Sequence, residues 1–419
     1  MGEAEGESVA MERPNAKVPS RRQVVAGLGA GAAMMMSPAF ASDEIRLPLA
    51  SGPDKRRLLS GFPQKGPMIV QRVRPPLLET PWSVFDEGVF TPNDRFFVRW
   101  HYMTTPTSID VDQYRLNIRG KVNEQLSLSP ADLMRDFPYF EIAAVNQCSG
   151  NSRGLFVPRI PGAQWGNGAM GNALWGGVRL KDVLDRAGVA TGARQVRFTG
   201  LDEAPMPGAP GYIKALDIDH ARDGEVMIAF AMNGEPLPLL NGFPMRLVVP
   251  GFFSTYWIKM LSDIEIIDHE DVGFWMKKAY RIPDTPHANI TQGEHPEKTL
   301  PIGPMAPRSF FTNLPPDGVV PQGKVVNLRG IAFGGDCGVR GVDLSFDGGK
   351  TWRAATLGSD EGKYGFRRWT ADFMPSEAGQ YAIGVRCTNT RNEMQSSNPN
   401  WNPGGFLRNL IETATLVSV

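Results

Sequence analysis

The sequence predicts an α+β protein with two domains, of which the second is a small Ig-like β-sandwich. The chain has 419 residues and is 42% apolar, which is enough for two or three domains with complete cores. Its 46 glycines and 35 prolines indicate many loops, so we expect strands and short helices. After a Pro-rich stretch at residues 283–321, short strands recur at regular spacing, which is typical of a sandwich.

Charge and cysteine content exclude several classes of protein. Lys+Arg and Asp+Glu both number 44, and this balance does not indicate nucleic acid or an anionic membrane as a partner. The 3 cysteines are too few for a disulfide scaffold, and no Cys-x-x-Cys-His motif for a c-type haem occurs. No stretch after the N-terminal region is long and apolar enough to span a membrane, so we expect a soluble mature protein.

Residues 1–41 are predicted to be a twin-arginine export signal. Arg21 and Arg22 form the arginine pair, an apolar run follows to Met36, and Ala39-Phe40-Ala41 fits the small-x-small cleavage pattern. A membrane anchor is the alternative, but the apolar run is too short to span. The pattern predicts a periplasmic protein that is exported folded, after it has acquired a cofactor. The Pro-rich extension that follows, residues 42–90, is expected to lie over the domain surface.

The most informative stretch surrounds Cys148. The apolar run Ile142–Val145 predicts a buried strand, and the Gly, Asn and Ser residues of 146–154 predict a tight loop after it. The loop holds the Cys148 thiol at a strand end, with Arg153 five residues on. Thiolates are soft metal ligands, and a neighbouring cation favours the thiolate. The alternative is a buried free cysteine with no chemical role.

The run Cys148-Ser-Gly-Asn-Ser-Arg153 resembles the Cys-x-Gly-Asn-x-Arg signature of sulfite oxidases, molybdenum enzymes whose single cysteine ligates the metal. The resemblance covers nearly all of the mature chain. It implies a molybdenum–molybdopterin cofactor with Cys148 as the protein ligand and Arg153 at the substrate. It also implies a sulfite-oxidase-type molybdopterin-binding domain at residues 91–295, followed by the Ig-like dimerisation domain at residues 300–419.

A second stretch, Phe96–His101, predicts an anion site. Arg99 and His101 lie two residues apart, so on an extended chain they share one face. The alternative is a solvated arginine and a core histidine. The resemblance implies that Arg99 binds the substrate oxyanion and that His101 lies near the cofactor.

Between these stretches and the linker we expect short regular elements. The sequence predicts a Gly-rich loop at residues 165–177, which lacks the Gly-Lys-Ser/Thr of a P-loop. The other expected elements are strand 114–122, a helix capped by Ser129 that runs to Phe137, helix 178–187 closed by Gly188, strand 195–199 and a buried strand within 242–251.

The resemblance assigns further residues to the cofactor. Arg246 and Lys259 would bind its terminal phosphate, and Ser254 would add a hydroxyl donor. Taken singly, the two cations could also be a strand-end arginine and a solvated lysine. Asp202 would hydrogen-bond the pterin, although a strand-end turn aspartate is nearly as good an interpretation. Asn241 departs from the family, because eukaryotic relatives carry histidine there.

The remaining assignments concern the substrate pocket and the second domain. The resemblance implies that Trp165 walls the pocket, that Tyr280 lies beside the metal and that Arg367 reaches in as a third sulfite-binding arginine; a strand-surface arginine is an equal alternative. Cys337 and Cys387 could pair in an oxidising compartment, but a loop and a strand position favour unpaired thiols. The expected strands of the domain are 325–333, 341–346, 351–357, 366–373 and 380–388, with a hairpin turn at 347–349.

With the export signal, the resemblance implies a periplasmic sulfite dehydrogenase. It would oxidise sulfite to sulfate and pass electrons to a c-type cytochrome or a haem subunit, as a homodimer or heterodimer. One alternative is a sulfane-sulfur dehydrogenase of a thiosulfate-oxidising complex. A methionine-sulfoxide reductase is disfavoured because it typically lacks the second domain. The alternative from another class is a periplasmic β-sandwich binding protein, which would contain no molybdenum.

Overall fold

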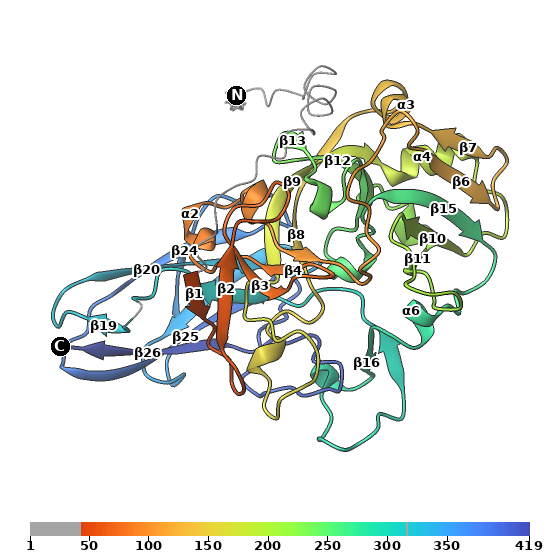
Figure 1. The fold of residues 1–419 in the computed structure, drawn as a ribbon. Helices are drawn as coiled ribbons and strands as arrows, with labels where there is room; N and C mark the ends of the chain where they lie inside the picture. Colours follow the sequence, from red (N-terminus) through yellow and green to blue (C-terminus); the bar gives the residue numbers. More distant parts are fainter. Residues whose placement is uncertain (1–42, 316) are drawn as a thin grey trace, which may run out of the picture.

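The computed structural model describes residues 43–315 and 317–419, so the predicted export signal lies outside the described residues. Strands dominate this part of the chain and its helices are short, in line with the glycine and proline content. No helix in the described ranges is long and apolar enough to cross a membrane. The strands form groups that lie side by side, with the C-terminal strands on one side of the molecule and the N-terminal sheet at its centre (Figure 1).

The N-terminal extension forms an antiparallel sheet and does not simply cover a surface. The last strand of this sheet, β5 (Val98–Arg99), follows the extension in sequence and carries Arg99 of the predicted anion site. The residue opposed to Arg99 is Leu77 of the neighbouring strand β4. The order of the sheet is β1 (Asp43–Arg46), β2 (Lys55–Leu59), β3 (Met68–Arg72), β4 (Leu77–Glu79) and β5 (Val98–Arg99).

Two further sheets build the central region. One is mixed, because β15 pairs parallel with β6, and its order is β11 (Ile213–Asp217), β10 (Gln195–Gly200), β15 (Leu261–Ile267), β6 (Leu116–Gly120) and β7 (Leu126–Leu128). The other runs β13 (Glu235–Pro236), β12 (Met227–Met232), β9 (Met170–Arg179) and β8 (Phe140–Gln147), with β14 (Arg246–Val248) also paired to β12. A small ribbon joins β16 (Arg281–Pro283) to β17 (Thr299–Pro301).

The short helices begin and end where local chemistry allows. Helix α3 (Pro130–Asp136) has the predicted Ser129 cap, and the Asp132 carboxylate accepts from the Ser129 backbone N–H at 2.9 Å. Helix α4 (Leu180–Ala187) ends at Gly188 as predicted but starts two residues late, because 178 and 179 end strand β9. The other helices are α2 (Val84–Glu87), α5 (Ile218–Ala221) and α6 (Phe274–Lys277).

The prediction of a Gly-rich loop at residues 165–177 is wrong from Met170 onward, where strand β9 runs. The glycines there serve close packing. A Cβ at Gly176 would lie 2.0 Å from the Tyr139 hydroxyl, and one at Gly177 would lie 2.0 Å from the Ile228 carbonyl oxygen. Two glycines in a strand therefore mark a close approach of neighbours and not a break in the strand.

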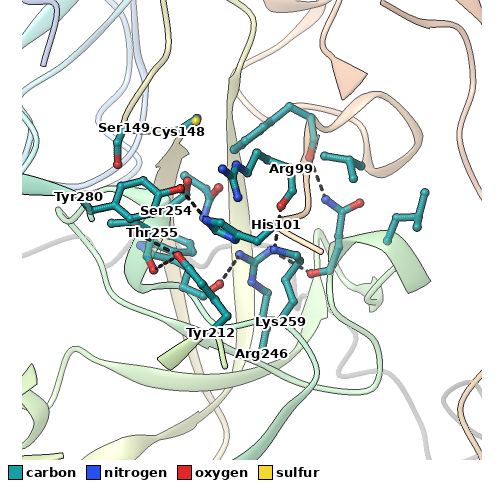
Figure 2. A pocket seen from close by; sticks show the side chains of 16 residues that line it. Arg99, His101, Cys148, Ser149, Tyr212, Arg246, Ser254, Thr255, Lys259 and Tyr280 are labelled. Atoms are coloured by element: carbon teal, nitrogen blue, oxygen red, sulfur yellow. Dashed lines mark hydrogen bonds between the residues drawn. The ribbon is translucent and has the colours of Figure 1, made fainter. Parts of the chain in front are cut away.

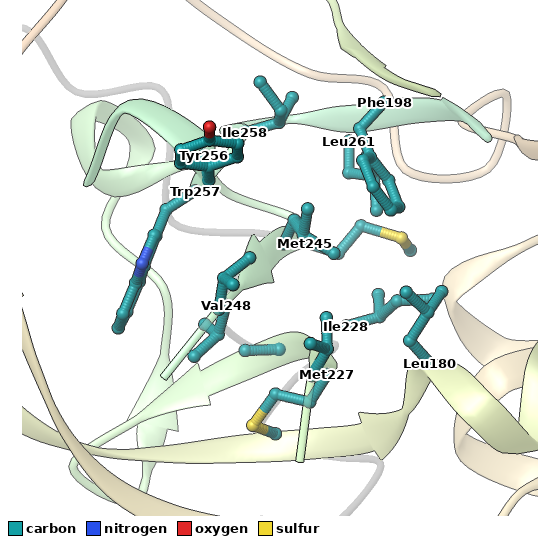
Figure 3. Close-up of a cluster of buried hydrophobic side chains, with 14 of the residues drawn as sticks. Leu180, Phe198, Met227, Ile228, Met245, Val248, Tyr256, Trp257, Ile258 and Leu261 are labelled. Atoms are coloured by element: carbon teal, nitrogen blue, oxygen red, sulfur yellow. The ribbon is translucent and has the colours of Figure 1, made fainter. Parts of the chain in front are cut away.

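A large apolar core joins the two central sheets. Leu180 of α4 packs with Met227 and Ile228 of β12, and with Leu261 of β15, in the cluster drawn in Figure 3. Helix α4 packs against β9 and β12, so its apolar face closes one side of this core. The core gives the loops that follow β8 and β14 a rigid base.

The C-terminal region consists of two sheets that share a core, in which Leu328 and Trp369 of one sheet meet Val342 and Leu416 of the other. Its Ig-like topology stays a prediction. The first sheet runs β18 (Arg308–Phe311), β20 (Val326–Phe333), β24 (Arg367–Phe373) and β23 (Thr356–Leu357). The second runs β19 (Val319–Val320), β26 (Glu412–Ser418), β25 (Gly379–Asn389), β21 (Val339–Ser345) and β22 (Arg353–Ala354). All three cysteines of the chain are free thiols in the structure.

The C-terminal region holds the central region at a buried polar contact. The Arg308 guanidinium, only 2% exposed, lies 2.6 Å from the Glu412 carboxylate and donates to the Ser152 hydroxyl at 3.0 Å. Phe85, Val145 and Phe310 belong to the apolar cluster around this contact. The cysteine loop is thus attached to the second domain.

Replacing Glu412 with glutamine should lower the free energy of unfolding by about 3 kcal/mol, because it leaves the buried Arg308 charge without its carboxylate. Urea denaturation followed by tryptophan fluorescence measures this. The same substitution at the exposed, unpaired Glu297 is the control and should change stability by no more than about 0.5 kcal/mol. Equal loss in both variants would contradict the role of the ion pair.

Candidate functional site

The loop after β8 presents the Cys148 thiol from a fixed backbone. The Cys148 N–H donates to the Ala169 carbonyl oxygen at 2.9 Å, and the Cys148 carbonyl oxygen accepts from the Asn151 N–H at 2.9 Å. The Asn151 side chain accepts from the Ala169 N–H at 3.0 Å. The thiol, on a residue only 6% exposed, therefore lies at the end of a strand with its backbone held on both sides.

Gly150 leaves room for Arg153 inside this loop. A Cβ at Gly150 would lie 2.3 Å from the Arg153 guanidinium, so a larger residue there would displace Arg153 from its position over the turn. Ser152 adopts a left-handed backbone with φ 68° and its N–H donates to the Gly166 carbonyl oxygen at 2.7 Å. The Gly-Asn-Ser run thus places Cys148 and Arg153 against one cavity, as the sequence predicts.

Cys148 lies at one end of an inner cavity and a pair of cations at the other (Figure 2). The cavity has about 470 Å³ of space, part of it open to solvent, and no carboxylate among its lining residues. Seven predicted site residues line it besides the thiol: Arg99, His101, Asn241, Arg246, Ser254, Lys259 and Tyr280. The remaining polar lining comes from Asn146, Ser149, Tyr212 and Thr255.

Strand pairing brings the two cations together. A single antiparallel bridge opposes Arg246 to Lys259, so their side chains share a face. Arg246 donates to the Asn241 carbonyl oxygen at 2.9 Å, and Lys259 donates to the Arg99 carbonyl oxygen at 3.0 Å. The Arg246 Nε is buried with no hydrogen-bond partner among the described residues. The pair is therefore arranged to receive an anion that the protein itself does not supply.

Burial is the main influence on the protonation of these cations. Loss of solvation lowers the pKa of Lys259 to about 7, and the nearby Arg246 charge contributes in the same direction. Burial likewise lowers the pKa of Arg246 to about 9. Both shifts mean that burial disfavours the positive charge, and a nearby anion would favour it again.

His101 and Tyr280 form a hydrogen-bonded pair at the centre of the cavity. His101 Nε2 and the Tyr280 hydroxyl lie 2.6 Å apart, and the imidazole stacks on Tyr212 with ring centroids at 3.7 Å. Burial, followed by the charges of Arg99 and Lys259, lowers the pKa of His101 well below its usual value. Burial raises the pKa of Tyr280. Both groups are therefore neutral near pH 7 and share one proton in a hydrogen bond.

An outer cavity opens from the same thiol. Cys148, Arg99 and Tyr280 line both cavities, and Arg153 and Trp165 line only the outer one. Its wall also includes Arg72, Leu77 and Phe406, and no carboxylate. The Arg153 guanidinium donates to the Gly404 carbonyl oxygen at 3.0 Å and to that of Ala163 at 3.3 Å. The buried Arg99 Nη1 has no hydrogen-bond partner among the described residues. The outer cavity therefore offers guanidinium groups to a small anion.

Two predicted site residues lie elsewhere. Asp202 lines neither cavity; it is close enough to Lys259 for the two charges to interact, while burial raises the pKa of Asp202. The expectation for Arg367 is wrong. Its guanidinium donates to the Gly358 carbonyl oxygen at 3.1 Å and lies 3.6 Å from Asp360, outside both cavities. Arg367 begins strand β24 and its side chain contacts residues of the second domain, so it is the strand-surface arginine that the sequence offers as the alternative.

Several site residues were not found from sequence. Tyr212 supports His101, and the buried Lys214 ammonium lies 4.4 Å from the centre of the Tyr256 ring. The buried Lys65 donates to the Asn241 side-chain oxygen and to the Asn93 carbonyl oxygen at 2.7 Å. Only Lys65 stands beside a sequence feature that marks a turn: it comes directly before a Gly-Pro pair and the apolar run of β3. The other two lie in segments whose pattern is that of an ordinary core.

The residues fit a metal carried by an organic, phosphorylated cofactor. No group of three or more His, Cys, Asp or Glu residues that could hold a metal alone occurs in the described ranges. A single thiol therefore needs further ligands from another molecule. The unpartnered Arg246 Nε and the Lys259 ammonium suit a phosphate at the far end, and the unpartnered Asn146 and Ser149 side chains can bond a polar ring between them.

Comparison with known proteins agrees with this arrangement. Residues 102–275 match the family model described as oxidoreductase molybdopterin binding domain, and residues 305–412 match that of the Mo-co oxidoreductase dimerisation domain. Mitochondrial sulfite oxidase of Homo sapiens is 34% identical, over 81% of this chain and 64% of the relative. Sulfite oxidase of Gallus gallus is 33% identical, over 87% of this chain and 80% of the relative.

A solved structure has a similar fold. The sulfane dehydrogenase SoxCD from Paracoccus pantotrophus superposes with a TM-score of 0.69, over 81% of this chain and 83% of that chain. Its sequence identity is 24%, so this likeness concerns the fold alone. The chain spans 64% of the human relative's length.

The Lys259 shift predicts how stability depends on pH in the cofactor-free protein. Between pH 7 and about 10, unfolded Lys259 binds a proton that the folded state does not, so the free energy of unfolding rises with pH. Lys259→Met removes this dependence. The variant should exceed the wild type in melting temperature most at pH 7 and less at pH 9.5. A gap that does not change with pH, or an equal gap for the exposed Lys278→Met control, would contradict this.

Proposed function

This chain belongs to the sulfite oxidase family of molybdenum enzymes, and from that premise we propose that it is a sulfite dehydrogenase. Its cofactor is molybdenum–molybdopterin. In the proposed reaction, sulfite and water give sulfate, two protons and two electrons. The observation that carries the proposal is the outer cavity, where guanidinium groups and the thiol of Cys148 converge without any carboxylate.

The inner cavity supports specific cofactor contacts. The Cys148 thiolate would hold the metal, Arg246 and Lys259 the terminal phosphate, and Ser254 would add a hydroxyl donor. Asn241 would contact the cofactor with an amide that Lys65 holds in place. Asp202, which interacts with Lys259 but lines neither cavity, would hydrogen-bond the pterin. When bound, the cofactor supplies the oxygen-atom transfer and takes up the two electrons.

The protein residues bind and orient the substrate. Arg99 has an unpartnered N–H group in the cavity, and the backbone carbonyls of Ala163 and Gly404 hold the Arg153 guanidinium. Two fixed guanidiniums neutralise a small oxyanion and fix its orientation. Trp165 walls the pocket and excludes water from one side. The neutral pair of His101 and Tyr280 can donate a hydrogen bond at the reacting oxygen without adding charge.

The setting of the reaction is also proposed. The twin-arginine pattern at Arg21 and Arg22 supports export of the folded protein to the periplasm. There a c-type cytochrome or a haem subunit would accept the electrons one at a time. The match of residues 305–412 supports a homodimer or heterodimer built on an Ig-like second domain. The proposed domain limits are 91–295 and 300–419, after a signal at 1–41 and an extension at 42–90.

Two alternatives predict different measurements. A sulfane-sulfur dehydrogenase would have the same fold and metal but would oxidise a sulfane sulfur and not sulfite. A periplasmic binding protein built on the sandwich would contain no molybdenum, which disagrees with the match to the molybdopterin-binding family model. Substrate choice therefore separates the two remaining functions.

The decisive assay is sulfite-dependent reduction of ferricytochrome c by the mature protein, with molybdenum content measured in the same sample. Rapid reduction would support the sulfite dehydrogenase. If molybdenum-loaded protein reduces neither ferricytochrome c nor ferricyanide with sulfite, the substrate assignment is wrong and the sulfane alternative is favoured.

Cys148→Ser should keep the fold and lose sulfite turnover by a factor of at least about 100, because a hydroxyl is a far poorer ligand for a soft metal than a thiolate. Circular dichroism and steady-state kinetics measure the two effects. Cys337→Ser, which changes a thiol outside both cavities, is the matched control and should be fully active. Normal turnover by the Cys148 variant would contradict the ligand assignment.

A further inference from the structure

Strand register aligns a second arginine with Arg99 across the N-terminal sheet. In the pairing of β3 with β4, Val70 is opposed to Leu78 and Arg72 to Leu77, with Gln71 as an extra residue between them. Leu77 is in turn opposed to Arg99 of β5. Directly opposed residues project from the same face of a sheet. Arg72, Leu77 and Arg99 therefore form one row on one face.

The β-bulge at Gln71 produces this alignment. In a regular ladder Gln71 would oppose Leu77, and Arg72 would point away from that face. Side-chain contacts hold the bulge: Gln71 donates to the Glu79 carboxylate at 2.7 Å, and the Arg56 guanidinium donates to the Gln71 side-chain oxygen at 3.0 Å. The Glu79 carboxylate also accepts from the Gly168 N–H at 3.0 Å, so it ties the strand to the segment that follows Trp165.

The row faces the outer cavity. Arg72, Leu77 and Arg99 all line it, together with Arg153 and the thiol of Cys148. Adjacent strands lie about 5 Å apart, so the Cα atoms of Arg72 and Arg99 are about 10 Å apart. An arginine side chain can cover half of that distance, which allows both guanidiniums to contact one small ligand between them.

Arg72 has no other role in the structure. It is exposed and forms no hydrogen bond or ion pair with another residue of the described ranges, whereas Arg46 and Arg56 of the same sheet do. Burial and the charge of Arg99 lower the pKa of Arg72. Three guanidiniums thus surround a cavity that has no carboxylate, and they repel one another until an anion is present.

We propose that Arg72 is the third oxyanion-binding residue of this site and that the N-terminal extension supplies it. The proposal rests on the proposed function, because it takes the substrate to be a small divalent oxyanion. Arg72 lies at the exposed edge of the cavity and Arg99 and Arg153 lie deeper, so Arg72 draws the anion in and then completes its contacts. Arg72 would thus have the role of third sulfite-binding arginine that the family resemblance gave to Arg367.

The test compares two arginines of one segment. Arg72→Gln removes the cavity charge. Arg74→Gln removes a charge two residues on that is also exposed and unpaired but does not line the cavity. With saturating cytochrome c, Arg72→Gln should raise the KM for sulfite about tenfold and change kcat less than about twofold, the loss expected for one charge-assisted contact. Arg72→Lys should recover part of the loss, and Arg74→Gln should match the wild type.

A binding measurement makes the result independent of turnover. Isothermal titration of the molybdenum-loaded protein with sulfate should show about tenfold weaker binding for Arg72→Gln than for Arg74→Gln. If the wild type oxidises sulfite and Arg72→Gln has the wild-type KM and sulfate affinity, the role of Arg72 is overturned. If no form oxidises sulfite but only Arg72→Gln loses sulfate affinity, the anion site stands and the proposed substrate is wrong.

Discussion

Buried positive charge without a protein counterion is the constraint on which this structure depends. Five cationic side chains line the two cavities that meet at Cys148, and no carboxylate lines either cavity. Desolvation makes such charge costly, as the lowered pKa values of Lys259 and Arg246 reflect. Under the proposed function, bound anions would offset this cost: a phosphate at the Arg246 end and an oxyanion at the Arg153 end. Cofactor binding and substrate binding are in this sense parts of one charge balance.

The second domain contributes to the site mainly by fixing its backbone; Phe406 is its one side chain among the described residues that line the two cavities, and it carries no charge. The Val145 N–H donates to the Tyr364 carbonyl oxygen at 2.8 Å, and Arg308 donates to the Ser152 hydroxyl at 3.0 Å. The Gly404 carbonyl oxygen accepts from Arg153 at 3.0 Å. These contacts hold the strand before the thiol, the turn after it and the nearest arginine. A ligand that must meet a metal in one geometry benefits from such preorganisation, because little entropy is lost on binding.

Sequence patterns predicted the local features of the structure, which depend on residues that are neighbours in the chain. The loop of Cys148, the shared face of Arg99 and His101, and the Ser129 cap follow from two to six consecutive residues. They did not predict which distant segments converge. Arg367 looked like a site residue, yet strand β24 places it outside both cavities, while Arg72 reached the cavity because one extra residue shifts the register of β3. Glycines that allow close strand packing, as at Gly176, have the sequence pattern of a loop, because the neighbour that they accommodate is remote in sequence.

The same charge balance explains why the centre of the site contains a neutral hydrogen-bonded pair. His101 lies among Arg99, Lys259 and Lys214, so a protonated imidazole there would add to an existing excess of positive charge. Its pKa falls and that of Tyr280 rises, so neither group changes its charge between about pH 7 and pH 9. The hydrogen bond between His101 Nε2 and the Tyr280 hydroxyl, 2.6 Å apart, can therefore persist while anions bind and dissociate. An ionisation that alters turnover in that range would therefore come from another group of the enzyme, from the cofactor or from the substrate, and not from the pair of His101 and Tyr280.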